Sequence, residues 1–329
     1  SCGGAYGDDY VEDEFYWAAA ELYITTGKSK YYDYMKSSKH FLEMPSELTG
    51  GEAQHGLVGA FDWGNVQGLG TLSLLVNEDV LSASEVTTIK NNITKAADAW
   101  IAIQNKQGYG ITIEQRSVLF DNPSLTGYPW GSNSFVANQS IVFAYAYDVS
   151  GNTKYYNGLT TAMDYLLGRN PNNQSYVSGY GSIPLENPHH RWFAYQLDPK
   201  FPEAPPGWLS GGPNSALQDP WVKGMGWKPG GMPPQKCFLD NIESWSTNEV
   251  TINWNAPLSW VTGYLTEIAD TGGPIDPPVG NVKLGDLNGD GVINSVDATL
   301  MSRLILEISA NADTNAADIN QDGRINTVD

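Results

Sequence analysis

The sequence predicts an all-α fold assembled from helical hairpins, in the form of a toroid or a solenoid. Helical periodicity of apolar residues recurs in seven stretches, whereas the strict alternation of a half-buried strand is scarce. Helical hairpins that repeat along a chain are typical of toroids and solenoids. The stretches expected to be helical are about residues 11–25, 29–43, 65–77, 84–104, 134–149, 153–168 and 254–268.

Two junctions between expected helices resemble each other. The segments "LYITTGKSKYYDYM" (22–35) and "AYDVSGNTKYYNGL" (146–159) each contain a glycine, a short polar turn and a pair of tyrosines. A glycine is the usual residue just beyond a helix C-terminus, because it adopts the left-handed conformation without strain. We therefore expect each junction to join two antiparallel helices.

Residues 169–253 lose the helical periodicity and are rich in proline, glycine and tryptophan. Loops of this length inside a compact domain are usually functional or disordered, and the tryptophans favour order. The segment "TGGPIDPPVG" (271–280) has the composition of a linker stiffened by prolines. We expect one domain over residues 1–270, a linker over 271–282 and a separate module over 283–329.

The chain is strongly acidic, with a net charge of −19 from 18 basic and 37 acidic residues. This charge argues against nucleic acid as a partner and is compatible with calcium or neutral ligands. No window approaches the roughly 18 consecutive apolar residues of a membrane-spanning helix, so no membrane partner is expected. Residues 1–25 also lack the basic-then-apolar order of a signal peptide.

Aromatic residues and cysteines leave alternatives open. The 11 tryptophans and 18 tyrosines either form the core of a large helical domain or offer flat rings for stacking on sugars, and composition does not choose between these roles. Cys2 and Cys237 could form one disulfide, but nothing in their spacing shows that they meet. We expect two unpaired thiols.

The C-terminal module contains one twelve-residue device twice, as "DLNGDGVINSVD" (286–297) and "DINQDGRINTVD" (318–329). Oxygen-bearing side chains occupy loop positions 1, 3, 5, 9 and 12, and a glycine stands at position 6, as in loops that wrap around Ca²⁺. Val292 and Arg324 would each offer a backbone carbonyl. The expected ligands are Asp286, Asn288, Asp290, Asn294 and Asp297 in the first loop, and Asp318, Asn320, Asp322, Asn326 and Asp329 in the second.

An aspartate closes both loops, and the first is preceded by "VGNVKLG" instead of a helix, unlike a sensor EF-hand. The duplicated pattern over residues 283–329 resembles a type I dockerin, the EF-hand-like module that binds a cohesin of a scaffoldin. The resemblance implies two calcium ions and a cohesin partner, selected by Ser295, Val296, Thr327 and Val328. The second loop ends at Asp329, so we expect a dockerin truncated in its second repeat.

Glu249 is the one charged residue in "WSTNEVTINWNAP" (245–257). A lone carboxyl among tryptophans and asparagines is expected to have a raised pKa, which suits a proton donor. Acid catalysis usually needs a second group that activates the nucleophile, and this stretch offers none.

The residues around Glu249 resemble a family signature. The run "FLDNIESWSTNEVTINWNA" is similar to the C-terminal signature of glycoside hydrolase family 9, the inverting cellulases with an (α/α)6 barrel, at Phe238, Asp240, Trp245, Glu249, Asn255 and Ala256. A second signature of that family fits "SYVSGYGSIPLENPHHR" at Ser175, Val177, Ser178, Gly181, Pro188, His189 and Arg191, while Ile183 stands where the family usually has a polar or basic residue. The resemblance covers residues 1 to about 270.

The site residues follow from the chemistry and from this resemblance. Glycoside hydrolysis needs a protonated carboxyl beside the leaving oxygen, and Glu249 is the expected acid. His189 and Arg191 would donate to hydroxyl groups near the cleaved bond, unless they are a satisfied loop histidine and a structural ion pair. Asp240 would orient the site or only cap a turn. The resemblance makes Trp130 and Trp254 sugar-stacking platforms, although either could instead belong to the core.

The family also implies a structural calcium ion near the N-terminus. Acidic residues are concentrated in "GDDYVEDEFYWAAAELY" (7–23), where helix capping and the helix dipole explain some of them. Tyr10 is a possible backbone ligand. The resemblance assigns the side-chain ligands to Asp9, Asp13, Glu14 and Asp62.

The catalytic base is not found in the sequence. Family 9 enzymes take it from an Asp-Ala-Gly-Asp stretch, which is absent from these 329 residues, and "YGDDY" (6–10) matches the calcium segment instead. The seven expected helices also fall short of the twelve in an (α/α)6 barrel. We therefore expect a barrel that is incomplete because its N-terminal part is absent, and a chain that is inactive by itself.

The leading hypothesis is a secreted, cellulosome-bound β-1,4-glucanase that hydrolyses cellulose with inversion. The alternative is a non-catalytic glucan-binding protein that carries a dockerin. The sequence leaves endo or exo action, the exact glucan and the cohesin partner open.

Overall fold

The computed structural model describes residues 10–47, 59–117, 124–270, 284–289, 293–306, 312–317, 319 and 325. The chain divides into two compact units, residues 1–274 and residues 275–329.

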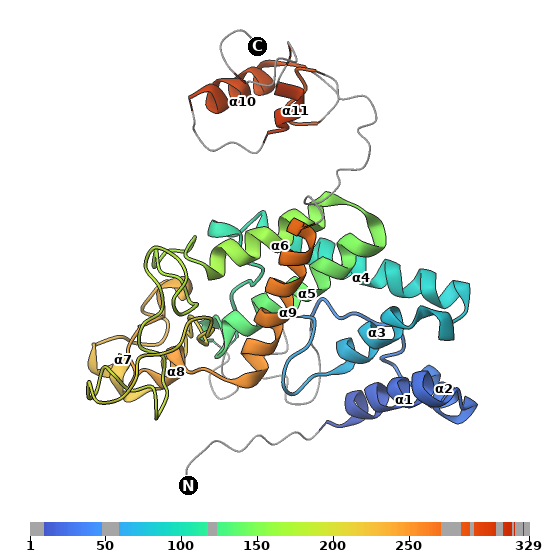
Figure 1. Ribbon diagram of the computed structural model, residues 1–329, viewed down its shortest axis with the longest axis horizontal. Coiled ribbons are helices and arrows are strands. Elements are labelled where there is room, and N and C mark those ends of the chain that lie inside the picture. The colour runs from blue at the N-terminus through green and yellow to red at the C-terminus, as the bar shows by residue number, and fades with distance from the viewer. Residues whose placement is uncertain are drawn as a thin grey trace. The chain divides into compact units, whose positions relative to one another are not determined.

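The first unit is helical, as the sequence predicts (Figure 1). Each of the seven expected stretches forms a helix, and the long ones are α1 (Glu12–Thr26), α2 (Ser29–Ser37), α3 (Gln67–Val76), α4 (Ala83–Gln104), α5 (Ser132–Ser150), α6 (Thr153–Leu166) and α9 (Ile252–Asp270). Shorter elements are α7 (Pro220–Gly224), α8 (Trp245–Asn248) and the 3-10 helices η2 (Glu78–Val80), η3 (Gly108–Gly110) and η4 (Pro234–Lys236). Two short antiparallel strands, β1 (Arg116–Ser117) and β2 (Thr126–Gly127), pair Arg116 with Gly127.

Helix α2 is shorter than expected, because the predicted stretch ran to residue 43 and the helix ends at Ser37. Ser38 is extended, with φ −72° and ψ 141°, and Leu42 has a positive φ of 61°. The apolar residues of this segment therefore reach the core from a turn and not from a further helical turn.

The two similar junctions adopt the expected conformation. Gly27 has φ 64° and donates its N–H to the carbonyl of Tyr23 at 2.8 Å. Gly151 has φ 65° and donates to the carbonyl of Tyr147 at 2.7 Å. In each case the next helix begins two residues later and packs against the preceding one. A side chain at either glycine would be strained in this left-handed conformation.

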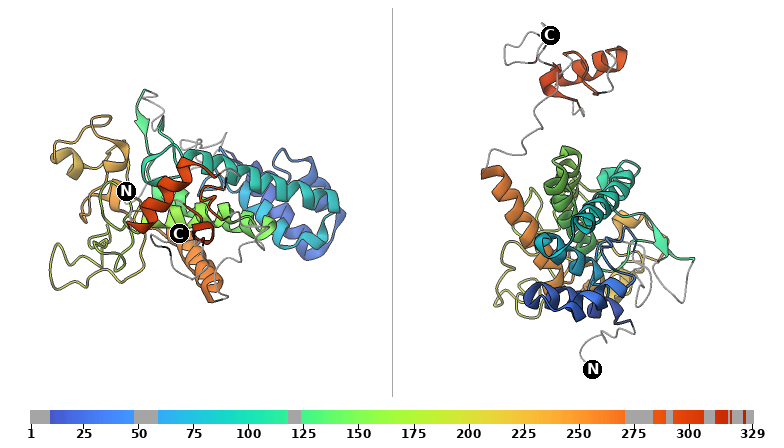
Figure 2. Two further views of the ribbon diagram at one scale, coloured as in Figure 1. Left: turned by 90° about the horizontal axis from the view of Figure 1, so that it is seen from above. Right: turned by 90° about the vertical axis from the view of Figure 1, so that its right-hand side faces the viewer.

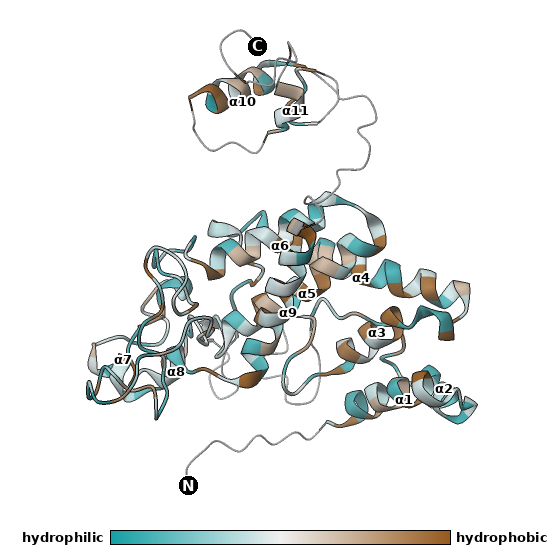
Figure 3. Ribbon diagram, viewed as in Figure 1, coloured by the Kyte–Doolittle hydropathy of each residue, from teal (hydrophilic) through white to brown (hydrophobic). Residues whose placement is uncertain are grey.

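Helix α5 is the centre of the first unit. It contacts α4, α6 and α9, and most of its residues are buried (Figure 1 and Figure 2). Helix α4 shows alternating apolar and polar bands, as an amphipathic helix should (Figure 3). Its Trp100 packs edge-on against Phe143 of α5, with ring centroids 6.0 Å apart. Burial of large side chains of this kind stabilises the fold by about 1.5–3 kcal/mol each.

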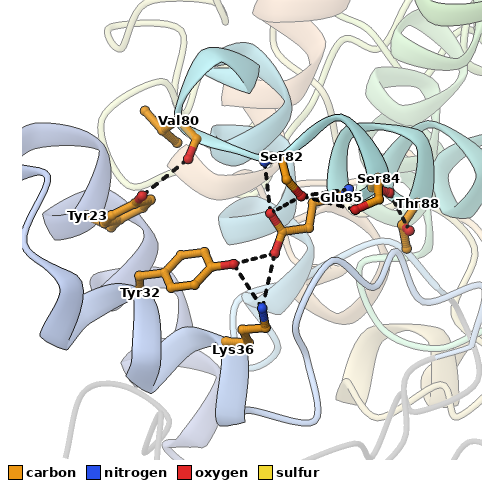
Figure 4. A network of polar contacts seen from close by, with 8 residues as sticks. All are labelled: Tyr23, Tyr32, Lys36, Val80, Ser82, Ser84, Glu85 and Thr88. Atoms are coloured by element: carbon orange, nitrogen blue, oxygen red, sulfur yellow. Dashed lines mark hydrogen bonds and ion pairs between the residues drawn. The ribbon is translucent and has the colours of Figure 1, made fainter.

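A polar network ties α4 to the hairpin of α1 and α2 (Figure 4). Ser82 and Glu85 form a capping box at the start of α4, and Glu85 also accepts a hydrogen bond from the hydroxyl of Tyr32 at 2.5 Å. Lys36 lies 3.7 Å from the same carboxylate. In addition, the hydroxyl of Tyr23 donates to the carbonyl of Val80 at 3.3 Å.

Residues 169–253 are described throughout, although they contain few regular elements. Isolated bridges join Val177 to Leu209, Ser178 to Leu185 and His189 to Glu249. These pairings, which the sequence does not reveal, place distant loop segments beside one another.

The second unit contains α10 (Ser295–Ile305) and α11 (Thr314–Ala317). Leu287, Met301 and Ala317 form its small apolar core. Among the described residues of the whole chain, no helix is both long and apolar enough to span a membrane.

Candidate active site and calcium sites

Glu249 follows directly after the short helix α8 and has an extended backbone. It forms a parallel bridge with His189, in which His189 donates its N–H to the carbonyl of Asn248 at 2.8 Å. On the other side, Gly211 donates its N–H to the carbonyl of Glu249 at 2.8 Å. The backbone of Glu249 is thus held between two loops.

The carboxyl group of Glu249 is partly buried and accepts one hydrogen bond from an aromatic side chain. The indole Nε1 of Trp130 donates to Oε2 at 3.2 Å. Burial raises the pKa of Glu249, while this hydrogen bond and the nearby charge of His189 oppose the rise. A carboxyl with a raised pKa is suited to proton donation.

The imidazole of His189 is oriented by a backbone carbonyl. Its Nδ1 lies 2.6 Å from the carbonyl oxygen of Ile242, so Nδ1 carries a proton and donates. The other nitrogen, Nε2, is the one left to meet a ligand.

Arg191 lies two residues further along the same loop and is exposed. Its guanidinium makes no ion pair within the described part of the chain, so the structural ion pair considered for it is not seen there. The turn is shaped by His190, whose Nδ1 accepts the N–H groups of Trp192 and Phe193 at 3.0 and 3.1 Å.

Asp240 connects the segments that carry His189 and Glu249. Its carboxylate accepts the backbone N–H groups of Glu186 and Asn187, both at 2.8 Å. It also accepts the side-chain amides of Gln174 at 2.8 Å and Asn248 at 3.2 Å. Asp240 therefore does more than cap a turn, because it joins the loop before His189 to the residue before Glu249.

Two residues that sequence reasoning missed complete this framework. Asn248 donates its side-chain amide to the carbonyl of Asn187. Asp219 is fully buried and accepts from the N–H groups of Val222 at 2.8 Å and Ser246 at 3.3 Å, and from the hydroxyls of Ser244 and Ser246. The Asp-Pro pair at 219–220 could have indicated a helix cap, but no local signal could have linked it to the segment before Glu249.

The two candidate platforms lie in different surroundings. Trp130 is partly buried and packs against Trp245, with ring centroids 5.2 Å apart and an interplanar angle of 30°. Trp254 is only 7% exposed. Side chains at Gly131 and Gly211 would bring Cβ atoms within 2.9 and 2.8 Å of its ring. This position fits the core role that was the alternative for Trp254.

The proposed N-terminal calcium ligands are brought together only in part. Asp13 is fully buried, and its Oδ2 accepts the N–H of Val66 at 2.8 Å while Oδ1 has no hydrogen bond. Burial raises the pKa of Asp62 to about 6, against hydrogen bonds from Asn65 and Gly64, and the charge of Asp13 adds to the rise. A cation at Asp13 would satisfy the unbonded Oδ1, so this buried carboxylate fits the chemistry of a metal ligand.

The other proposed N-terminal calcium ligands give less support for a metal site. Glu14 is partly buried, and the hydroxyl of Tyr10 lies 2.7 Å from Nε2 of His40. Asp9 lies outside the described residues. Within the described ranges no group of three or more acidic, histidine or cysteine side chains converges as a metal site would require.

The first C-terminal loop is closed by Asp297. Its carboxylate accepts the N–H groups of Asn294, Leu287 and Asn288 at 2.9, 2.8 and 3.2 Å. The bond from Asn294 contributes most to lowering the pKa of Asp297. Asp286 is 7% exposed in the same loop. Outside the described residues lie Asp290, Val292, Asp318, Asn320, Asp322, Arg324, Asn326, Thr327, Val328 and Asp329.

Residues at other predicted positions can also be placed. Ser295 is exposed and Val296 is 51% exposed at the start of α10. Cys237 is a buried free thiol whose pKa burial raises to about 11, and Cys2 lies outside the described residues.

Comparison with known proteins establishes the class of this molecule. Residues 1–262 match the family model "Glycosyl hydrolase family 9", and residues 284–329 match "Dockerin type I domain". The chain therefore belongs to glycosyl hydrolase family 9 and carries a type I dockerin, which is a calcium-binding module. Both resemblances predicted from the sequence are confirmed, as is an all-α fold of the (α/α)6 barrel type.

Individual relatives show the same relationship. The chain is 50% identical to a "Cellulose 1,4-beta-cellobiosidase" of Acetivibrio thermocellus over 96% of this chain and 35% of that protein. It is 41% identical to "Endoglucanase C" of Cellulomonas fimi over 80% of this chain and 22% of that protein. A single-mutant structure of a thermostable endoglucanase from Alicyclobacillus acidocaldarius superimposes with a TM-score of 0.62 at 29% identity, over 80% of this chain and 45% of the other. The chain thus spans less than half of each of these proteins.

Proposed function

We propose that the chain is part of a β-1,4-glucanase that hydrolyses cellulose with inversion, and that Glu249 is its general acid. The observation that carries this proposal is the carboxyl of Glu249, which is partly buried, has a raised pKa and is aligned beside His189. The cellobiosidase and endoglucanase relatives support the substrate class.

In this mechanism Glu249 protonates the oxygen of the leaving glucosyl unit while the bond to the anomeric carbon breaks. An inverting enzyme also needs a carboxylate roughly 6.5–9.5 Å away, which directs water to the opposite face of the sugar. The family's Asp-Ala-Gly-Asp stretch does not occur in these 329 residues. We therefore assign the base to an aspartate of the enzyme that lies beyond them, and expect residues 1–329 to be inactive by themselves.

The residues next to Glu249 bind the glucan or position the segments of the site. Nε2 of His189 and the exposed guanidinium of Arg191 face sugar hydroxyls in the proposed complex, and Trp130 offers a ring for stacking. Asp240 acts as a positioning residue, because its four hydrogen-bond donors come from both segments of the site.

The C-terminal module would attach the enzyme to a cohesin of a scaffoldin, in a secreted, extracellular cellulosome. Asp286, Asn288, Asn294 and Asp297 are the described residues that would hold calcium in its first loop. Asp13 and Asp62 would hold a further ion in the first unit. Calcium would supply structural order at each site and take no part in hydrolysis.

The decisive experiment compares Glu249→Gln with the unchanged protein, in a catalytic domain completed by the upstream segment of a family 9 relative. We expect hydrolysis of cello-oligosaccharides to fall by at least about 1000-fold, because the amide cannot donate a proton at the required acidity. Binding should persist, and proton NMR of the product should show the inverted anomer. A retained anomer, or a variant of unchanged rate, would refute the mechanism.

A non-catalytic glucan-binding protein is the second candidate, because the partly buried Trp130 and the exposed Arg191 could hold a glucan without cleaving it. Under this alternative the completed domain does not hydrolyse cello-oligosaccharides. Glu249→Gln would leave the glucan affinity unchanged, and neither protein would release reducing ends.

A further inference from the structure

The contact between Trp130 and Glu249 joins residues 119 positions apart and selects one carboxyl oxygen. Nε1 of Trp130 lies 3.2 Å from Oε2 of Glu249, and an indole N–H can only donate. Oε2 is therefore held as an acceptor. In the protonated carboxyl the proton accordingly resides on Oε1.

The indole is fixed in this orientation by its surroundings. One side of Trp130 packs against Trp245, at 5.2 Å between ring centroids. The next residue, Gly131, has a left-handed φ of 72° at the start of α5 and lies against the ring of Trp254. A larger residue at position 131 would be strained and would collide with Trp254. The contact between Gly131 and Trp254 thus fixes the backbone next to Trp130, and the contact with Trp245 fixes its ring.

We propose that Trp130 is a positioning residue for the general acid, which keeps the transferable proton on Oε1 and stabilises the carboxylate that remains after transfer. This inference gives Trp130 a role beyond sugar stacking, and its catalytic meaning rests on the proposed function. The proton passes from Oε1 to the glycosidic oxygen, and the electron pair of the breaking C–O bond goes to that oxygen. Water supplies the new bond to the anomeric carbon and gives its proton to the base.

Few charged groups lie beside Glu249, so the hydrogen bond from Trp130 affects the ionisation of its carboxyl. The bridged segment carries the basic residues His189, His190 and Arg191, and His189 is the one whose electrostatic effect lowers the pKa of Glu249. The flanking segments 128–134 and 205–213 contain no charged residue. On the segment before Glu249, Asp240 is occupied by its four donors, and Glu243 is exposed. Trp130 is therefore the neutral group that most directly favours the ionised form.

The test uses the full 329-residue chain and needs no activity. In protein labelled with ¹⁵N-tryptophan, the indole N–H resonance of Trp130 should move with pH and follow the ionisation of Glu249. The titration should vanish in Glu249→Gln, whose fold and indole are otherwise intact. In Trp130→Phe, the side-chain carbonyl ¹³C signal of Glu249 should report an acid dissociation constant roughly tenfold smaller, as loss of a donor to a carboxylate requires.

The matched control is Trp245→Phe, which removes the neighbouring indole N–H without removing the donor to Glu249. It should leave the dissociation constant of Glu249 within about twofold of its original value. An indole signal of Trp130 that does not respond to pH, or a folded Trp130→Phe with an unchanged Glu249 titration, overturns the proposal. If Trp130→Phe does not fold, the comparison with Glu249→Gln decides alone. The hydrolysis experiment above is independent, so failure of one does not decide the other.

Discussion

His189 and Glu249 lie opposite each other in a parallel bridge, although 59 residues separate them in the chain. The backbone N–H of His189 donates to the carbonyl of Asn248, the residue before Glu249, and Nδ1 of His189 donates to the carbonyl of Ile242. The proposed acid and the proposed substrate-binding imidazole therefore share one framework, and a change in that framework should affect both.

Asp240→Asn tests this framework. In the variant, an amide NH2 takes the place of one carboxylate oxygen and meets either the donors of Glu186 and Gln174 or those of Asn187 and Asn248. The loop before His189 should therefore separate from Asn248. We expect the free energy of unfolding to fall by about 2 kcal/mol, because hydrogen bonds to a charged group are lost inside the protein. Urea unfolding measures the change, and calorimetric titration with a cello-oligosaccharide should show weaker binding.

The control for this variant is Asp198→Asn in a neighbouring loop. Asp198 accepts one local hydrogen bond, from the N–H of Lys200 at 3.0 Å. Its substitution should change the free energy of unfolding by no more than about 0.5 kcal/mol. Equal effects of the two substitutions would remove the argument that Asp240 connects the site.

Trp254→Ala separates a core residue from a sugar platform. Because the ring is almost fully buried against Gly131 and Gly211, its removal leaves a cavity that should lower the free energy of unfolding by about 3–5 kcal/mol. Trp192→Ala is the control, since that ring is 62% exposed and its loss should cost less than about 1 kcal/mol. A stable Trp254→Ala protein with reduced glucan affinity would instead support the platform.

The helices could be predicted from sequence because their signal is local. Apolar spacing defined α5 and α6, and Gly151 marked the junction between them. The end of α2 was missed because Ser38 adopts an extended conformation that no local residue pattern indicates. Periodicity also cannot reveal α8, which has only 4 residues.

The family signatures indicated candidate site residues in the sequence, but not the contacts between them. The family signatures identified Glu249, His189 and Asp240 along the sequence. The hydrogen bond from Trp130 to Glu249 and the anchoring of Ser246 by Asp219 connect residues 119 and 27 positions apart. Only the packing of the irregular segment 169–253 brings such groups together, and that packing depends on tertiary contacts.

Calcium binding at Asp13 should stabilise the first unit. Ligand that binds only the folded state at about 100 times its dissociation constant adds about 2.7 kcal/mol to the free energy of unfolding. Calcium should therefore raise the melting temperature of the larger calorimetric transition, and chelation should reverse the rise. Asp13→Asn should abolish the response, because the buried carboxylate loses its charge.

Asp33→Asn is the matched control for this experiment, since Asp33 is exposed on α2. It should keep the full calcium response. The experiment uses the whole chain, in which the smaller transition of the dockerin should respond to calcium in every variant. That response verifies that calcium is present. A first unit whose melting temperature ignores calcium would contradict the assignment of Asp13.

Glu85 should make the stability of the first unit depend on pH in the acidic range. Burial pushes the pKa of Glu85 upward, but hydrogen bonds from Ser82 and Tyr32 and the charge of Lys36 outweigh it, so the pKa is lowered (Figure 4). A carboxyl with a lowered folded pKa contributes stability above its unfolded pKa of about 4.3, and that contribution is lost as pH falls through the folded value. Glu85→Gln should therefore reduce the free energy of unfolding by about 1 kcal/mol at neutral pH, as expected for loss of a capping carboxylate. The difference should disappear once the pH lies below the folded pKa of Glu85. Urea unfolding of both proteins across this pH range measures the difference, with Glu78→Gln as control.

Glu78 lies 2.8 Å from Lys90 in an exposed ion pair, whose removal should cost less than about 0.5 kcal/mol. A constant difference between the Glu85 variant and the unchanged protein at every pH would show that the side chain acts by packing, and not through its charge.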